Sequence, residues 1–79
     1  MKIGDRVEVH WLDAQSGTGL SVYIEELEDL EPLRSISFGV LLLQKKEHII
    51  LGTMTFGEER VKHYQLIPRG MIKKIKILR

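Results

Sequence analysis

Hydrophobic and polar residues alternate along much of the chain with a period of two, which is the period of a strand with one buried face. The first example is the N-terminal segment, where Val7, Val9 and Trp11 share one face. This pattern predicts a first strand over residues 4–13. A small, polar and glycine-rich segment at residues 13–19 follows it and predicts a loop.

The middle of the chain contains the strongest hairpin signal. An extended apolar run over residues 35–43 is followed by a polar turn at residues 44–47 and a returning strand at residues 48–56. Near its end the first of these strands is apolar on both faces, because Leu41 and Leu43 continue the apolar pattern onto the second face. Such a strand is covered by a second sheet or by a neighbouring subunit.

Two further strands are predicted in the C-terminal third of the chain. Residues 57–59 form a tight turn, and residues 60–67 form the fourth strand. The segment Pro68-Arg69-Gly70 interrupts the pattern, since proline lacks an N–H and glycine accepts a positive φ. Residues 71–78 then form the fifth strand.

Glycines inside the two strands of the hairpin bear on how the sheet closes. Gly39 and Gly52 lie where glycine commonly marks a bulge or a sharp bend, and small barrels need such bends. Five short strands with tight turns and one long early loop predict an all-β fold, a small closed barrel. The 79 residues form one domain, residues 1–79.

The early loop has two interpretations. From Tyr23, apolar residues recur at the spacing i, i+4 and i+7, which fits a short amphipathic helix within residues 21–31. Ser21 would cap its start, and Pro32 would end it. The alternative is an ordered loop.

Charge is strongly segregated along the chain, although the formal net charge is only +1. Five acids and no base lie between Glu25 and Glu31, and seven bases and no acid lie between Arg60 and Arg79. The basic end suits a nucleic acid or an acidic partner. Alternatively, the two segments screen each other, within one subunit or between neighbours.

The composition excludes some of the usual ways in which so small a domain is stabilised. A chain of this length buries roughly 60% of its unfolded surface, and disulfides are excluded because there is no cysteine. The three histidines lie far apart without ligand spacing, so no metal and no cofactor are expected. Self-association is the remaining route, and we expect a homo-oligomer.

The sequence also limits location and chemistry. No apolar run is long enough for a signal peptide or a membrane span, so we expect a cytoplasmic protein with no membrane partner. The spacing suggests neither a Ser-His-Asp set nor an isolated pair of carboxylates. We therefore expect a binding protein and not an enzyme.

With the strands placed, the chain resembles the Sm-like barrels and the related Src-homology-type barrels. His48-Ile49-Ile50-Leu51 is similar to the Sm-like pattern of a polar residue followed by Leu-Val-Leu, and Ile67-Pro68-Arg69-Gly70 is similar to its Ile-Arg-Gly element. The chain also resembles small phage and prophage proteins of unknown function. That likeness lies in a Val-x-Val-x-Trp-x-Asp-Ala start (Val7 to Ala14), a hairpin entry (Ser35 to Gly39) and a final Pro68, Arg69, Gly70 and Ile72.

The Sm-like resemblance implies a ring of five to seven copies, made by pairing edge strands of adjacent subunits. It also implies single-stranded RNA binding around the pore. In the corresponding positions His48 takes the place of the base-reading asparagine, Lys46 lies beside it, and Arg69 closes the site. If the protein is phage-encoded, the compartment is the cytoplasm of the host cell.

Other candidate contacts follow from the residues themselves. Lys45 and Lys46 can hold a phosphate backbone, which needs positive charge but little geometry. Tyr64 can stack on a base beside basic groups, and the remaining candidates for stacking are expected in the core: Trp11, Phe38 and Phe56. Alternatively, Arg69 is a residue of the turn and makes no contact with a partner.

Three functions remain open from the sequence. The first is an oligomeric ring whose basic C-terminal surface binds RNA or another nucleic acid weakly. The second is a structural or adaptor module, in which the acidic segment and the basic end are complementary interface patches. The third is a monomeric Src-homology-type peptide binder, which needs an exposed aromatic groove.

Overall fold

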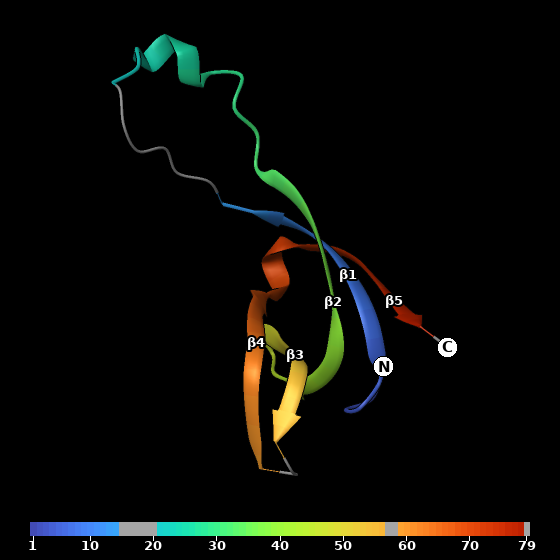
Figure 1. The fold of residues 1–79 in the computed structure, drawn as a ribbon. Coiled ribbons are helices and arrows are strands. Elements are labelled where there is room, and N and C mark those ends of the chain that lie inside the picture. The colour runs from blue at the N-terminus through green and yellow to red at the C-terminus, as the bar shows by residue number, and fades with distance from the viewer. Residues whose placement is uncertain (15–20, 57–58, 79) are drawn as a thin grey trace.

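The computed structural model describes residues 1–14, 21–56 and 59–78, and it shows one antiparallel sheet of five strands (Figure 1). The order across the sheet is β4-β3-β2-β1-β5. The strands are β1 (Arg6–Asp13), β2 (Leu33–Gln44), β3 (His48–Phe56), β4 (Arg60–Pro68) and β5 (Ile72–Leu78). The predictions of an all-β fold, of five strands and of the central hairpin are confirmed.

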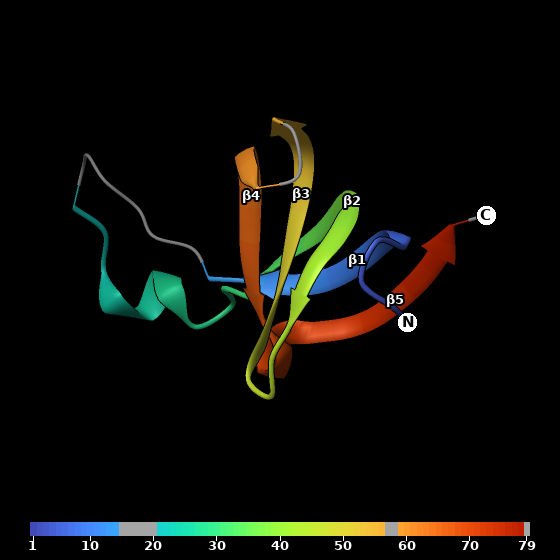
Figure 2. The ribbon, with the colours of Figure 1, turned by 90° about the horizontal axis from the view of Figure 1, so that it is seen from below.

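The predicted closure into a barrel is wrong. Strands β4 and β5 lie at opposite edges of the sheet, and no backbone pairing joins them among the residues that the structure describes. A short 3-10 turn, η2 (Arg69–Met71), connects the two strands where the sequence predicted a break. Figure 2 shows that β4 and β5 run in different directions from this turn, so each leaves one edge of the sheet open.

Strand β2 belongs to both halves of the sheet. Residues 33–40 pair with β1, whereas residues 40–44 pair with β3 across a bulge between Leu41 and Leu43. The two halves therefore meet at the middle of β2, where the sheet bends. The core lies between them and consists of buried residues from both halves: Val7, Val9, Trp11, Leu41, Ile49, Leu51 and Ile67.

The side of β2 that faces this core carries small residues. Ser35, Ser37 and Gly39 lie opposite Trp11, Val9 and Val7 in the register. The Trp11 indole N–H donates to the Ser37 hydroxyl at 3.0 Å, which satisfies the one polar atom of that buried ring. Small residues on β2 thus make room for the large side chains of β1.

Two predictions about β2 are corrected by the same register. Phe38 was expected in the core, but it lies opposite Glu8, on the face away from the core, and its side chain is 57% exposed. Leu43 is exposed as well, whereas Leu41 is buried. Within this chain, the far end of β2 is therefore covered on one side only, and its cover by a neighbouring subunit stays a prediction. Trp11 is buried as predicted, and the side chain of Phe56 lies outside the described residues.

The described part of the early loop, residues 21–32, forms an arm that projects from one end of the sheet (Figure 1). Its only described helical element is η1, a 3-10 turn over Ile24–Leu27 in which no residue is buried. Tyr23, not Ser21, is the residue that precedes this turn as its N-cap. A longer amphipathic helix over residues 21–31 is absent because, at this distance from the sheet, an apolar helix face has no surface to pack on.

The arm makes the molecule elongated, with principal extents of 49 × 24 × 23 Å. Residues 21–32 are all exposed. Within the described ranges, no helix has the length and apolar character needed to cross a membrane.

The bend in β2 leads to a first prediction. A Cβ atom added at Gly39 would lie 3.0 Å from the carbonyl oxygen of Gly52 and 3.2 Å from Cβ of Leu51. Because a backbone oxygen cannot rotate away, Gly39→Ala should lower the free energy of unfolding by about 1–3 kcal/mol. Urea unfolding followed by the fluorescence of Trp11, the one tryptophan, measures this.

Gly70→Ala is the matched control, since a Cβ there meets no heavy atom within 4 Å. It should change the free energy of unfolding by less than about 0.5 kcal/mol. Equal destabilisation by both substitutions would show that the Gly39 contact does not limit the bend.

Candidate functional site

Four of the five predicted contact residues come together at one end of the sheet. Lys45 and Lys46 lie in the β2–β3 turn, His48 begins β3 opposite Pro68, and Arg69 begins η2. The backbone N–H of Arg69 donates to the carbonyl of Glu47 at 2.8 Å, which joins η2 to the turn. We call Lys45, Lys46, His48 and Arg69 the turn cluster.

The Arg69 side chain has a structural task within the turn cluster. Its Nε donates to the carbonyl oxygen of Lys45 at 2.8 Å, and its Nη2 donates to Oε1 of Gln44 at 3.4 Å. The Lys45 backbone N–H in turn donates to the carbonyl of His48 at 2.9 Å. Arg69 therefore tethers the turn, while the two lysine side chains are exposed at its tip.

Tyr64 lies apart from the turn cluster. It is on β4 opposite Gly52, four residues along the strand from the His48–Pro68 pair, a distance of roughly 13 Å. Its ring is 66% exposed and borders a hollow of about 470 Å³ that also has Leu43, Ile50 and Arg60 in its wall. The structure does not bring Tyr64 to the other four residues.

The basic residues of the C-terminal third do not form one surface either. Arg60 and Lys62 lie on β4 and Arg69 lies at the turn. Lys74 and Lys76 lie on β5, at the opposite edge of the sheet. The uniform basic run in the sequence is therefore divided among three places.

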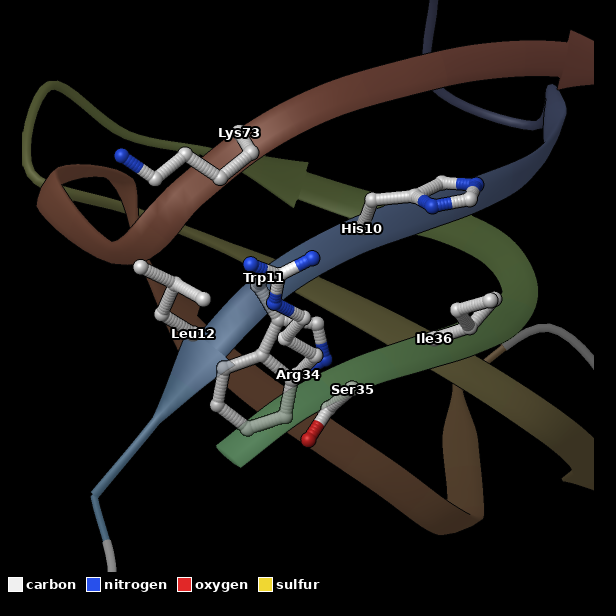
Figure 3. Close-up of a pocket in the computed structure, with 7 residues that line it drawn as sticks. All are labelled: His10, Trp11, Leu12, Arg34, Ser35, Ile36 and Lys73. Atoms are coloured by element: carbon white, nitrogen blue, oxygen red, sulfur yellow. The ribbon is translucent and has the colours of Figure 1, made fainter. Parts of the chain in front are cut away.

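A hollow of about 610 Å³ that the sequence reasoning missed lies over β1 and its two neighbours (Figure 3). The cationic groups on its wall come from β2 and β5 and lie on either side of β1 (Figure 3). Its lining consists of His10, Trp11, Leu12, Arg34, Ser35, Ile36 and Lys73. Lys73 belongs to it because β5 has a bulge there: His10 pairs with Lys74, whereas Trp11 pairs with Ile72.

The register defines the surface around this hollow. Across β2, β1 and β5, one row is Ile36, His10 and Lys74, and the next is Phe38, Glu8 and Lys76. We call this side of the three strands, opposite to the core, the outer face. It has an apolar column on β2, a polar column on β1 and a basic column on β5. The alternation of polar and apolar residues in β1 and β5 indicates that each strand has one polar face. Only the pairing of the strands shows which polar side chains lie next to each other across the sheet.

Glu8 is the acidic member of the outer-face rows, and its charge is held by its neighbours. His10 Nε2 donates to Glu8 Oε2 at 2.6 Å. This hydrogen bond is the main cause that lowers the pKa of Glu8 below its ordinary value of 4.5. The charges of Lys76 and Lys74 act in the same direction, and partial burial opposes them. Glu8 thus keeps its negative charge into acid solution.

Within the described ranges, no group of three or more histidine, aspartate or glutamate side chains could hold a metal ion. Comparisons with protein-family models, with curated proteins and with solved structures each gave no match to this chain.

The Glu8–His10 pair leads to a second prediction, on acid stability. Since the folded state lowers the pKa of Glu8, ionised Glu8 contributes stability above about pH 4.5, and this contribution is lost as the pH falls through the lowered value. Glu8→Gln should therefore flatten the loss of stability on the acid side of pH 4.5. Urea unfolding at a series of pH values measures the slope.

His10→Ala is the companion variant, because it removes the donor while it retains the carboxylate. It should flatten the same part of the profile, since the pKa of Glu8 then returns toward its ordinary value. Acid profiles that are parallel in the wild type and in both variants would contradict the role given to this pair.

Proposed function

We propose that the protein is an assembly module that forms a homo-oligomer through the open edges of its sheet. Strands β4 and β5 each pair on one side only among the described residues. An open edge presents a row of N–H and C=O groups that another strand can satisfy. Pairing of β4 in one copy with β5 in the next would continue the sheet from subunit to subunit.

The distribution of apolar side chains is the observation that carries this proposal. More large hydrophobic side chains are exposed than buried in the described part of the chain. Several of them lie on the strands and not only in the arm: Ile36, Phe38, Leu43, Val61, Tyr64, Leu66, Ile77 and Leu78. A monomer of this size gains little from its own core, and association would bury the remainder.

The resemblance to Sm-like proteins supports a closed form of this assembly. In that form, five to seven copies pair the edge strands of adjacent subunits and close into a ring. The likeness to phage proteins supports a location in the cytoplasm of a phage host as part of this proposal. If the ring does not close, the alternative is an adaptor, in which the copies bind a second protein.

The third prediction concerns the mass in solution. Light scattering at low salt and at about 0.5 M salt should give one discrete multiple of 9.1 kDa, five- to seven-fold for a ring. Backbone pairing and apolar burial resist salt, so the mass should persist at the higher concentration. A monomer at both salt concentrations would contradict the proposed assembly.

A second candidate function is weak binding of single-stranded RNA at the turn cluster. The specific observation is that η2 brings Arg69 to the turn that carries Lys45, Lys46 and His48. Two exposed lysines can contact phosphates, and an imidazole can stack on a base. Arg69 contributes by holding the turn in place.

The fourth prediction tests this candidate with a fluorescent oligouridine. The double variant Lys45→Ala/Lys46→Ala should weaken binding and reduce the slope of log K against log salt by roughly 1–2. Lys74→Ala/Lys76→Ala removes the same charge from the outer face and is the matched control. Equal losses in the two double variants, or no salt dependence in the wild type, would argue against a site at the turn.

A further inference from the structure

The outer face of the sheet has the features of a docking site for a protein segment. Its hollow of about 610 Å³ is open to solvent, and Ile36 and Phe38 beside it are 56% and 57% exposed. Arg34 and Lys73 line the hollow (Figure 3). Lys74, which pairs with His10, continues the positive charge along β5. A segment that fits this surface must carry both apolar side chains and acids.

The chain itself contains such a segment. Residues 21–32, which we call the acidic arm, expose large apolar side chains to solvent: Val22, Tyr23, Ile24, Leu27 and Leu30. Between them lie the acids Glu25, Glu26, Glu28 and Asp29. Apolar and acidic groups thus alternate over a short length, as the outer face requires.

We propose that the outer face binds the acidic arm of a second copy of the chain. This inference rests on the proposed assembly and names a contact within it. The Ile24–Leu27 turn contributes apolar side chains to the hollow and to Ile36. The neighbouring carboxylates pair with Arg34 and Lys73 at its rim.

The path of the chain favours a second copy over the same one. The acidic arm joins the sheet at Leu33, which pairs with Asp13 at the end of the β1–β2 ladder. The neighbouring pair, Leu12 with Arg34, already belongs to the hollow. Both views show the arm directed away from the sheet from this point (Figures 1 and 2). The arm therefore extends away from its own outer face and can reach that of a neighbour.

The charge balance of the outer face favours an acidic polypeptide over RNA. Glu8 lies between Arg6 and His10 on the polar column of β1, and its lowered pKa keeps it negative, so it would repel a phosphate placed directly over it. A polypeptide can place apolar side chains over this column and direct its carboxylates to the basic rim. Like charges then stay apart, and both apolar surfaces leave water.

Charge reversal on both sides tests the contact and is the fifth prediction. Arg34→Glu/Lys73→Glu and Glu25→Lys/Glu28→Lys should each raise the dissociation constant of the assembly by about tenfold or more. The four changes together should restore it to within about threefold, because opposite charges face each other again. Sedimentation over a range of concentrations measures all three variants.

Lys45→Glu/Lys46→Glu is the matched control, since it makes the same change of charge in the β2–β3 turn, outside the outer face and outside both edge strands. It should not be rescued by Glu25→Lys/Glu28→Lys. Circular dichroism establishes that each variant is folded. Rescue of both pairs alike would show a general effect of net charge and would overturn the contact.

A second measurement does not depend on charge. The chain has no cysteine, so single-cysteine variants can be mixed without other thiols. Leu27→Cys mixed with Ile36→Cys should form a disulfide-linked heterodimer under mild oxidation. Leu27→Cys mixed with Lys62→Cys should form much less.

The outcomes separate this inference from the proposed assembly. One outcome is an oligomer whose dissociation constant is unchanged by every charge reversal and whose Leu27→Cys variant does not prefer the Ile36→Cys partner. That outcome would overturn the docking of the arm but would not contradict edge pairing. A wild-type monomer that forms no heterodimer would overturn both. A chain carrying both cysteines that links only within itself would show that the arm binds its own face, and would overturn exchange between copies.

Discussion

Strand β2 passes from one half of the sheet to the other, and its bend requires backbone segments to approach closely at Gly39. A Cβ atom at position 39 would lie only 3.0 Å from the carbonyl oxygen of Gly52, so the close approach leaves no room for a larger residue than glycine. This approach allows β1 with β5, and β3 with β4, to converge on one small core. Without the bend, a single five-stranded sheet would have no second layer to bury its apolar face.

The bend also decides which side chains remain outside. On the inner side of β2, small residues are needed to accommodate Trp11, Val9 and Val7, and the larger alternate residues therefore point outward. Ile36 and Phe38 become surface residues for this reason, beside the polar column of β1. The apolar surface for which we propose partners is thus a consequence of how the core is packed.

This explains what the sequence could and could not reveal. Strand positions, the central hairpin and the break at Arg69 were predictable because alternation and turn chemistry are local properties. The burial of Phe38 was predicted wrongly because a period of two identifies a face but not its partner. Ser37, opposite Val9, shows that the less apolar face of β2 is the inner one, and that pairing is not local. The closure of the barrel was predicted wrongly for the same reason, because it depends on whether β4 and β5 pair, and this is not a local property of either strand.

The candidate site follows the same division. The turn cluster was predictable as a set of residues near one turn, and the interpretation of Arg69 as a turn arginine agrees with its hydrogen bonds to Lys45 and Gln44. The hollow on the outer face was not predictable, because Arg34 and Lys73 are distant in sequence. They come together only through the register of β1 with both of its neighbours and through the bulge at Lys73.

The two proposed contacts place different demands on the molecule, and they are compatible. Edge pairing uses the backbone of β4 and β5, whereas the docking of the acidic arm uses side chains over β1 and β2. A neighbour that pairs along β5 extends the sheet in its own plane and leaves the outer face open. Backbone pairing supplies a repeated, salt-resistant link, and the arm adds charge complementarity, which selects the partner. We therefore propose that this open sheet, with its short core, its acidic arm and two edges that are free among the described residues, is one subunit of a larger structure.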